Sequence, residues 1–571
     1  MISLSIESLL NVFYISELYI WTENRKVEGK MAKTMVPRVK NHEFNKELCS
    51  LGREINVYVD SAESQVGLSS LRVFLSEINF IESSRNNSVI EFKLNKELSE
   101  QAEYYEIEIT DDKILISYVD RLAARNAVST LVNIIEKTGD TYTVPQGRIW
   151  DYPDFSFRSG LIESSGRAWM TLEELKQSIT RMAVNKFNYV HFHFLEFAGC
   201  SVALDTFPKL VGYGPDNLKY TKDEVRDLVK FAGSVGIELI PGIEMPGHSQ
   251  ALLEAYPELS CKTEPGVNTS TWVTCAGSEV TYDAYEKLLV EVADLFPCKY
   301  VQIGADEIDF GEGSGREPAW LDCIECKGLC EREGISTERE IFYYVIRRVH
   351  EMATKLNKKI IIFNDQVDIS VTPDIPKDVI IQFWIISGRG PREGCSFERF
   401  LEEGFTVINS HVHDTYVDFE AYATSRSINQ WSPWSRPSFN PKYSKQIIGA
   451  EFCAWEKHPH FKYTLPSVMA LYGDRLWNLE RTDYDEKYAI KMTRNILGVN
   501  TPKVFNIFKY LGDVLPPRDD KNKAYLDKVD ASNEELNAAK EILDKIATCN
   551  IYGSDAAIAY IDCINWVLEN R

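Results

Sequence analysis

Residues 171–194 read TLEELKQSITRMAVNKFNYVHFHF and contain one complete helix-then-strand unit. Thr171 and Glu174 form the pattern of a capping box, which satisfies free backbone groups at the start of a helix. A run of apolar residues at helical spacing follows, and Tyr189–Phe194 has the length and aromatic content of a strand. Residues 221–243 repeat this order, again beginning with a capping box. Alternation of this kind predicts parallel strands that are joined by helices.

The same order of elements recurs across the middle of the chain. The candidate strands are Gly160–Glu163, Tyr189–Phe194, Glu238–Ile243, Tyr300–Gly304, Lys359–Phe363, Val379–Trp384, Thr406–Ser410 and Ile447–Cys453. Eight strands that alternate with helices predict a (β/α)8 TIM barrel, which we place at residues 151–490. An open doubly wound sheet is the alternative. Nucleotide chemistry gains no support, because no glycine-rich phosphate loop follows the first strand.

Two further regions flank the predicted barrel. Residues 41–150 are predicted to form a small α+β domain, because strand-like alternation at Ile55–Val59 is later followed by helical periodicity over Asp120–Ile135. Residues 491–571 are predicted to form a helical C-terminal region, with the clearest amphipathic pattern at Ala531–Ala547. This region could support the barrel or form a subunit contact in a homodimer.

Residues 1–40 are interpreted as an N-terminal extension. They begin with an apolar stretch that carries Glu7 and Glu17 and lacks the basic region and small-residue cleavage site of a secretory signal. We expect a strand or an amphipathic helix there, and therefore a cytoplasmic protein. Elsewhere no stretch of sequence reaches the roughly 18 uncharged apolar residues that a membrane span needs.

The net charge of −22 excludes some classes of partner. Binding to nucleic acid requires a basic surface, and attraction to anionic lipid requires clustered Lys and Arg. We therefore expect neither nucleic acid nor a membrane as a partner. The charge does not identify a substrate, since net charge mainly affects solubility and association.

The 12 cysteines are scattered along the chain, and reduced thiols are expected without a signal sequence. Cys323, Cys326 and Cys330 form a C-x2-C-x3-C group with no obvious fourth ligand nearby. A zinc site is one interpretation of this group. The alternative, which we favour, is a thiol-bearing loop and helix start.

Chemically active residues gather where the predicted strands end. In a (β/α)8 barrel the C-terminal ends of the strands form one face, and this face carries the reacting groups. The first strand begins at Arg158. The later strands lead to His191, His193 and Glu196, to Glu244 and His248, to Asp306 and Glu307, to Asn364 and Asp365, to Trp384, to Tyr416 and Asp418, and to Trp455. Together these residues predict a pocket with carboxylates on one side and aromatic walls on the other.

Aromatic walls and carboxylates suit a sugar ligand. Cleavage of a glycosidic bond needs a carboxylic acid to protonate the leaving oxygen and a group that stabilises an oxocarbenium-like centre. Asp306 and Glu307 could supply both, provided that the strand ends just before them, because neighbouring strand residues point to opposite faces. Repulsion between two close carboxyls would also help to keep one of them protonated near neutral pH.

Four segments resemble the motifs of family 20 glycoside hydrolases. They are residues 151–158 (DYPDFSFR), 182–193 (MAVNKFNYVHFH), 236–259 (GIELIPGIEMPGHSQALLEAYPEL) and 302–307 (QIGADE). The resemblance spans roughly residues 50 to 490. In that family the 2-acetamido oxygen of the substrate acts as the nucleophile in place of an enzyme carboxylate, so catalysis is substrate-assisted.

The resemblance implies a role for each matching residue. Glu307 would be the general acid and base, Asp306 would orient the acetamido group, and Tyr416 would donate to the acetamido oxygen. The implied substrate-binding residues are Arg158, His193, Glu244, His248, Trp384, Asp418, Trp455 and Lys457. Of these, Arg158 would hold ring hydroxyls, Trp384 and Trp455 would enclose the sugar, and Glu244 and His248 would support the acid pair.

The sequence departs from the family pattern around this pocket. Gln302 and Ala305 stand where the H-x-G-G-D-E motif has its histidine and its second glycine. Asn364 stands where the family has a tryptophan after strand five. Residues 194–201 differ from the stretch that the family has after the second strand. The third-strand acid is Glu244 in place of Asp. A lysine, Lys457, stands where the family has a glutamate, which suggests the hypothesis that an anionic or modified sugar is preferred.

We therefore interpret the chain as an exo-acting, retaining β-N-acetylhexosaminidase that removes terminal N-acetylglucosamine or N-acetylgalactosamine from a glycan. No metal or organic cofactor is implied. Three alternatives remain: a variant that releases a disaccharide or a modified amino sugar, a carbohydrate-binding protein without catalysis, and a barrel hydrolase with a carboxylate nucleophile.

Overall fold

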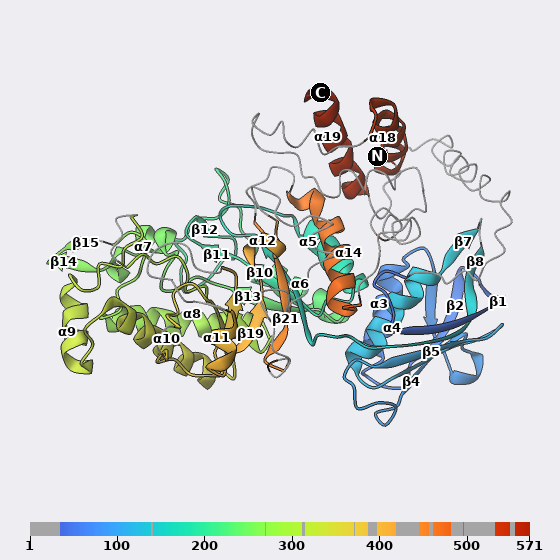
Figure 1. Ribbon diagram of the computed structural model, residues 1–571, viewed down its shortest axis with the longest axis horizontal. Helices are drawn as coiled ribbons and strands as arrows, with labels where there is room; N and C mark the ends of the chain where they lie inside the picture. Colours follow the sequence, from blue (N-terminus) through green and yellow to red (C-terminus); the bar gives the residue numbers. More distant parts are fainter. Residues whose placement is uncertain are drawn as a thin grey trace.

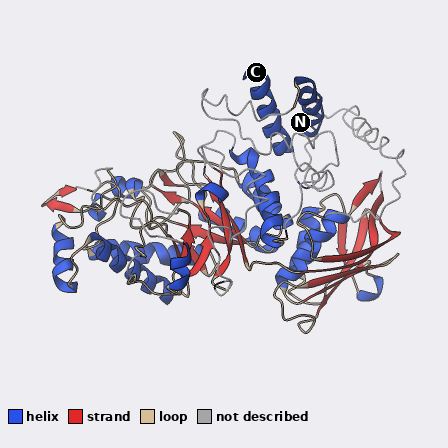
Figure 2. Cartoon of the chain, viewed as in Figure 1, coloured by secondary structure: helices blue, strands red, loops and turns tan. Residues whose placement is uncertain are grey.

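The computed structural model describes residues 35–138, 141–268, 270–310, 315–369, 372–385, 397–417, 443, 445–455, 461–480, 495, 531–548 and 554–570 (Figure 1). The predictions for residues 1–34, for Asp418 and for Lys457 fall outside this part of the chain. Figure 2 shows a β-rich unit beside a larger unit in which helices surround a group of strands.

The first unit is a twisted sheet with the strand order β1-β8-β5-β6-β4-β2-β3, and β7 pairs with β8. Its strands are β1 Asn41–Leu51, β2 Glu54–Tyr58, β3 Asn79–Glu82, β4 Ile90–Leu94, β5 Tyr105–Ile109, β6 Ile114–Tyr118, β7 Glu136–Thr138 and β8 Thr141–Asp151. Helices α3 (Gln65–Phe74) and α4 (Arg121–Ile134) pack against each other and contact helices of the second unit. They therefore lie between the sheet and the barrel, which confirms the small α+β domain (Figure 1).

The second unit is a closed parallel barrel. Its strands are β9 Phe157–Glu163, β10 Tyr189–His193, β13 Glu238–Gly242, β16 Tyr300–Gln302, β17 Lys359–Phe363, β18 Ile380–Phe383, β19 Thr406–Asn409 and β21 Ile447–Ala454. Each pairs in parallel with the next, and β21 closes the ring by pairing with both β19 and β9. The predicted TIM barrel is confirmed, and closure rules out the open sheet.

Helices connect the strands of the barrel, and the long ones are built as the sequence pattern predicts. They are α5 Leu172–Val184, α6 Lys222–Ser234, α7 Gln250–Ala255, α8 Glu279–Leu295, α9 Ile324–Glu333, α10 Glu338–Lys355, α11 Phe397–Glu402, α12 Val412–Thr415 and α14 Phe461–Trp477. Both predicted capping boxes are present at Thr171 and Thr221, and a third begins α10 at Thr337. Such caps satisfy backbone groups that would otherwise lack partners.

The helical C-terminal prediction is confirmed at α18 (Asn533–Thr548) and α19 (Ser554–Asn570). These two helices pack against each other, and α19 also contacts α14 of the barrel (Figure 1). Within the described residues, the C-terminal region therefore supports the barrel, which was one of the two roles the sequence left open.

Layers of side chains fill the barrel interior. The layer at the N-terminal strand ends is largely apolar and includes Phe157, Ile240 and Tyr300. Above it, Glu451 accepts hydrogen bonds from Ser159 and Gln382 and pairs with His191, and Gln302 donates to Gln382. Buried polar side chains must satisfy one another in this way, because an unpaired one is costly. This hydrogen-bonded polar layer, in which only one ring nitrogen of His191 is engaged, lies beneath the catalytic face.

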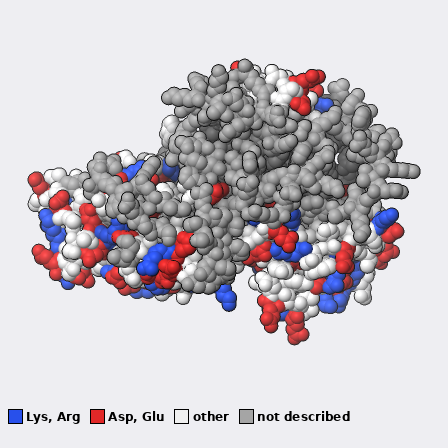
Figure 3. Space-filling model, in the orientation of Figure 1, with Lys and Arg blue, Asp and Glu red and all other residues white. Residues whose placement is uncertain are grey.

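In the described residues no helix is long and apolar enough to cross a membrane. On the face shown in Figure 3, acidic and basic side chains are interspersed over the described parts of both units.

Candidate active site

The C-terminal strand ends of the barrel bring together the residues that the sequence singled out. Strands β9 and β10 end at Glu163 and His193, which are paired in register. Glu244 and His248 follow β13, and the carboxyls of Asp306 and Glu307 follow β16. Because parallel strand ends meet at one face of a barrel, these side chains surround a common site.

The backbone after β16 turns sharply, which directs both carboxyls to one side. The strand ends at Gln302, and then Gly304, Ala305 and Glu307 adopt positive φ angles of 65°, 68° and 51°. A Cβ atom at residue 304 would lie 1.5 Å from Glu244 Oε2, so this position requires glycine. The prediction that the strand must end before the acid pair is confirmed.

Glu307 is held by cations and by fixed hydrogen bonds. Its Oε2 atom lies 2.7 Å from Arg316 Nη1 and 3.4 Å from His248 Nε2. Its backbone N–H donates to Asp365 Oδ2 at 2.9 Å. Burial opposes ionisation, but His248 and Arg316 outweigh it and lower the pKa of Glu307 to about 2.

Asp306 has the opposite electrostatic environment. Burial raises its pKa to about 7, Asp365 and Glu307 add to this effect, and His248 opposes it. The sequence predicted that one carboxyl of the pair stays protonated near neutral pH. Because the pKa of Asp306 is the higher of the two, Asp306 carries that proton when no ligand is bound. Two such close carboxyls titrate as a unit.

His248 connects the acid pair to a further carboxylate. Its Nδ1 atom pairs with Glu196, and its Nε2 atom lies 3.8 Å from Asp306 Oδ2. Burial disfavours the charged ring, but Glu196, Asp306 and Glu307 together raise the pKa of His248 well above its usual value. The Trp272 ring packs on His248 with a centroid distance of 4.6 Å, and its indole N–H donates to the Glu307 carbonyl. His248 is thus a largely buried ring whose charged form is favoured, and it contacts both acids.

The floor of the site contains more carboxyls than the sequence prediction included. Arg167 Nη2 lies 3.1 Å from Glu163 Oε2, and its Nε atom lies 3.5 Å from Glu196 Oε2. His193 Nε2 lies 3.7 Å from Glu244 Oε1, and burial lowers the pKa of His193 well below its usual value. Burial, together with Asp306, raises the pKa of Glu244 well above the usual range.

An aromatic wall stands across from the carboxyls. Trp384 and Tyr416 stack with a centroid distance of 6.0 Å and an interplanar angle of 10°, and Trp455 meets Tyr416 at the same centroid distance. The Trp384 indole N–H donates to Asp365, the residue that also holds the Glu307 backbone. Burial, Cys453 and the acid pair raise the pKa of Tyr416, so its hydroxyl stays protonated and able to donate.

Arg158 does not lie in this site, so the prediction that it binds substrate is wrong. It lies near the start of β9, five residues before Glu163, which is about 16 Å away at the usual rise of a strand. Its guanidinium is buried, pairs with Glu103 of the first unit and donates to the Lys186 carbonyl. Arg158 therefore joins the two units, whereas Arg167, which follows the end of β9, lies at the catalytic face.

Several site residues had no role assigned from the sequence. Glu163, Arg167, Glu196, Trp272, Arg316 and Asp365 all contact the predicted residues. Glu196 and Asp365 were among the strand-end residues that predicted the pocket, but neither was included in the predicted catalytic or substrate-binding set. Arg316 and Trp272 lie far along loops, and nothing in their local sequence indicates a site. Asp418 and Lys457 lie outside the described residues.

Asn364, which stands where the resemblance led us to expect a tryptophan, has a structural role here. It is fully buried, and its side chain accepts a hydrogen bond from the Trp384 backbone at 2.8 Å and donates to the Ile385 carbonyl. The residue fixes the end of β18 and hence the start of the aromatic wall.

A closed parallel barrel that presents paired carboxyls opposite an aromatic wall is the arrangement of a glycoside hydrolase. Residues 155–480 match the catalytic domain of glycosyl hydrolase family 20, and residues 32–152 match domain 2 of the same family. The chain therefore belongs to glycosyl hydrolase family 20.

Relatives with assigned names agree with this placement. The chain is 26% identical over 356 residues to a β-hexosaminidase of Porphyromonas gingivalis, covering 60% of this chain and 43% of that protein. It is also 26% identical over 404 residues to a β-hexosaminidase of Vibrio furnissii, covering 64% and 63%. The chain thus spans less than two thirds of the length of both curated relatives.

Solved structures support the same fold. An exo-β-N-acetylglucosaminidase of Vibrio harveyi, solved with N-acetylglucosamine, gives a TM-score of 0.69 at 21% identity and covers 82% of this chain and 78% of that one. A β-N-acetylhexosaminidase of Bacteroides fragilis gives 0.68 at 23% identity and covers 81% and 94%. At 21% and 23% identity, the similarity to these two structures shows the fold alone.

Proposed function

We propose that this chain is an exo-acting, retaining β-N-acetylhexosaminidase that uses the substrate's acetamido group as its nucleophile. The observation that carries the proposal is the turn after β16, which places Asp306 and Glu307 on one side of the pocket near a protonated Tyr416. The names of the relatives support the same substrate class.

The chemistry would proceed in two displacements. The Glu307 proton goes to the glycosidic oxygen as the C1–O bond breaks, and the acetamido oxygen bonds to C1 to give an oxazolinium ion. Water then adds to C1, transfers its proton to Glu307 and restores the acetamide. Two inversions at C1 leave the product with the original β configuration.

Asp306 and Tyr416 would act on the acetamido group. An ionised Asp306 accepts a hydrogen bond from the N–H and offsets the positive charge that develops on the oxazolinium. The Tyr416 hydroxyl donates to the acetamido oxygen and holds it in line with C1. An acceptor on one end and a donor on the other fix the orientation of the nucleophile.

For this reaction the proton shared by the acid pair must move from Asp306 to Glu307. Without a ligand Asp306 holds it, whereas catalysis needs it on Glu307. The acetamido N–H favours the Asp306 anion, since it can only donate. The Arg316 guanidinium opposes the transfer, because it stabilises the ionised form of Glu307.

Replacing Arg316 with Gln should therefore raise the pKa of Glu307. A general acid must be protonated, so its contribution is lost as the pH rises through its pKa. We expect the alkaline limb of kcat/KM in Arg316→Gln to move upward by about 1 pH unit or more. The matched control is Arg347→Gln on helix α10, which removes an ion pair with the exposed Asp374. An unchanged alkaline limb in Arg316→Gln would show that this ion pair does not control the acid.

Substrate binding would use the floor and the aromatic wall. Arg167, Glu163 and Glu196 offer charged partners for ring hydroxyls, and they take the place that the sequence had given to Arg158. Within the described residues, His193 Nδ1, Glu244 Oε2 and Asp306 Oδ1 are buried atoms without a hydrogen-bond partner in the protein. Buried polar atoms need partners, and a sugar bound in the pocket would supply them.

A panel of aryl glycosides tests the proposal. Purified protein should cleave aryl β-N-acetylglucosaminide, β-N-acetylgalactosaminide or both, leave aryl β-glucoside intact, and release the β anomer first. Cleavage of the plain glucoside at a comparable rate would instead indicate a carboxylate nucleophile. Binding of the amino sugar without turnover would favour a carbohydrate-binding protein. Activity confined to sulfated sugars or to disaccharide release would favour a variant specificity.

A further inference from the structure

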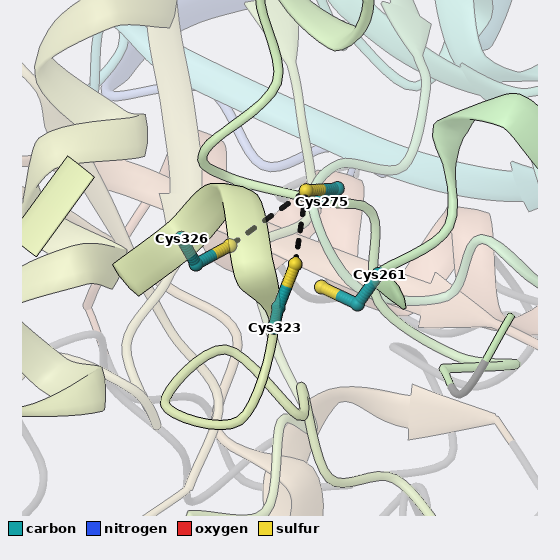
Figure 4. Close-up of side chains that lie close together, drawn as sticks. All are labelled: Cys261, Cys275, Cys323 and Cys326. Carbon is teal, nitrogen blue, oxygen red and sulfur yellow. Dashed lines mark hydrogen bonds between the residues drawn. The ribbon is translucent and has the colours of Figure 1, made fainter. Parts of the chain in front are cut away.

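Four buried cysteines converge beside the catalytic face: Cys261, Cys275, Cys323 and Cys326 (Figure 4). Their Sγ atoms all lie within 4.8 Å of one another. Cys275 Sγ is 3.6 Å from Cys323 Sγ and 3.7 Å from Cys326 Sγ. A disulfide would bring two sulfurs to about 2.05 Å, so none of these pairs is oxidised.

The spacing is that of a tetrahedral thiolate centre. Zinc–sulfur bonds of about 2.3 Å separate the corners of a tetrahedron by roughly 3.8 Å, close to the two separations between these sulfurs. Figure 4 shows the four sulfur atoms turned toward a common centre. The group therefore has the number, type and geometry of ligands that a closed metal site requires.

The fold assembles this group from two distant segments. An isolated antiparallel bridge between Ser260 and Thr274 joins the two parts of one loop, and the Sγ atoms of Cys261 and Cys275 in these parts lie within 4.8 Å of each other. Cys323 is the N-cap of α9, and Cys326 lies in the first turn of that helix. The sequence had grouped Cys323 and Cys326 with Cys330, which lies one turn further on, outside the cluster. The two ligands that the sequence analysis missed, Cys261 and Cys275, lie in a loop roughly 50 to 65 residues earlier in the chain.

Polar groups contact the sulfurs, and Cys275 Sγ lies 3.4 Å from Glu325 Oε2. The Gly277 backbone N–H donates to Cys326 Sγ at 3.2 Å. The N-terminus of α9, with its partial positive charge, lies at Cys323 and Cys326. A Cβ atom at residue 277 would lie 2.3 Å from the Glu325 backbone, so glycine permits this close approach. Amide donors and a helix N-terminus are suitable neighbours for a thiolate-bound cation.

We propose that these four cysteines bind one Zn²⁺ ion as a structural centre. Soft thiolate ligands in a tetrahedral S4 set select zinc among the common divalent ions. Four protein ligands leave no open position for water or substrate, which distinguishes a structural site from a catalytic one. The site is separate from the acid pair and does not depend on the proposed hydrolase activity.

The centre would fasten together the two loops that carry the acid side of the active site. One loop follows β13 and includes Trp272, which packs on His248, and Thr274, whose N–H donates to the Pro246 carbonyl. The other follows β16 and includes Arg316, which pairs with Glu307. Trp320 of the second loop donates to the Thr274 carbonyl of the first at 2.9 Å. Joining the two loops through the four cysteines would keep His248 and Glu307 at a fixed distance from each other.

Elemental analysis of the purified chain is the direct test. Wild-type protein prepared with reductant and without added chelator should contain about one zinc per chain. Cys323→Ser should lose it, whereas Cys330→Ser, a change one to two turns along the same helix, should retain it. Metal-free wild-type protein with all thiols open to titration would overturn the proposal, and so would equal zinc in both variants.

A second measurement applies even if Cys323→Ser does not fold. Titration of wild-type protein with an organomercurial should release its zinc in step with modification of about four thiols, and Co²⁺ replacement should give the strong visible bands of tetrahedral thiolate cobalt. Zinc release without thiol modification, or octahedral cobalt spectra, would place the metal elsewhere. Both readouts are independent of glycosidase activity, so failure of the proposed function would leave them intact.

Discussion

Glu307→Gln should lower kcat/KM for aryl β-N-acetylglucosaminides by about 10²–10⁴-fold, because the amide keeps the shape of the side chain but cannot transfer a proton. The loss should depend on the leaving group. Phenols of low pKa depart without protonation, so their first displacement should fall least, and poor leaving groups should suffer most. The measurement is a plot of log(kcat/KM) against the pKa of the leaving phenol. Its slope should be much steeper for Glu307→Gln than for the wild type.

The matched control for this change is Glu286→Gln, which replaces an exposed glutamate on α8, away from the site. It should retain wild-type kinetics. If Glu307→Gln lost the same factor with every leaving group, the residue would be acting on binding or folding, and its assignment as the acid would be wrong.

Asp306→Asn should lower kcat/KM on the same substrate by about 10²–10³-fold. The substitution removes the negative charge that faces the developing oxazolinium ion and leaves an amide that can turn its N–H₂ toward the substrate N–H. A thiazoline analogue of the oxazolinium resembles the transition state, and such analogues bind far more tightly than substrates. We therefore expect the variant to lose affinity for the thiazoline by a larger factor than it loses affinity for the product sugar.

Asp283→Asn, an exposed change on α8, serves as the control for Asp306→Asn and should leave both affinities unchanged. Equal losses of affinity for thiazoline and product in Asp306→Asn would contradict a role for Asp306 in stabilising the intermediate, because uniform loss indicates ground-state binding alone.

The barrel and the acid pair could be predicted because their signals are local. Capping boxes such as Thr171 with Glu174 mark where helices begin, and runs such as Tyr189–His193 mark buried strands. Strand ends of a parallel barrel share one face, so Asp306, Glu307 and Tyr416 could be grouped before any coordinates were known.

The remaining site depends on contacts between distant segments. Arg158 lies at the start of β9 and Arg167 follows its end, so the rule that C-terminal strand ends carry the site already favoured Arg167, and the resemblance led to the wrong residue. Arg316 approaches Glu307 from a long loop, and its effect on the acid pair depends on a contact of 2.7 Å. Cys261 and Cys275 meet Cys323 through a contact between two loops that no local pattern indicates. Sequence periodicity does not specify such loop contacts.

The most direct test of the central claim is the rate for aryl β-N-acetylglucosaminides whose acetamido group carries zero, one, two or three fluorines. Fluorine withdraws electrons from the acetamido oxygen, far from the glycosidic bond, and weakens it as a nucleophile. If that oxygen attacks C1, log(kcat/KM) should fall steeply and linearly with each added fluorine. A rate that is indifferent to fluorination would contradict substrate assistance and would indicate that an enzyme carboxylate or water attacks C1 directly.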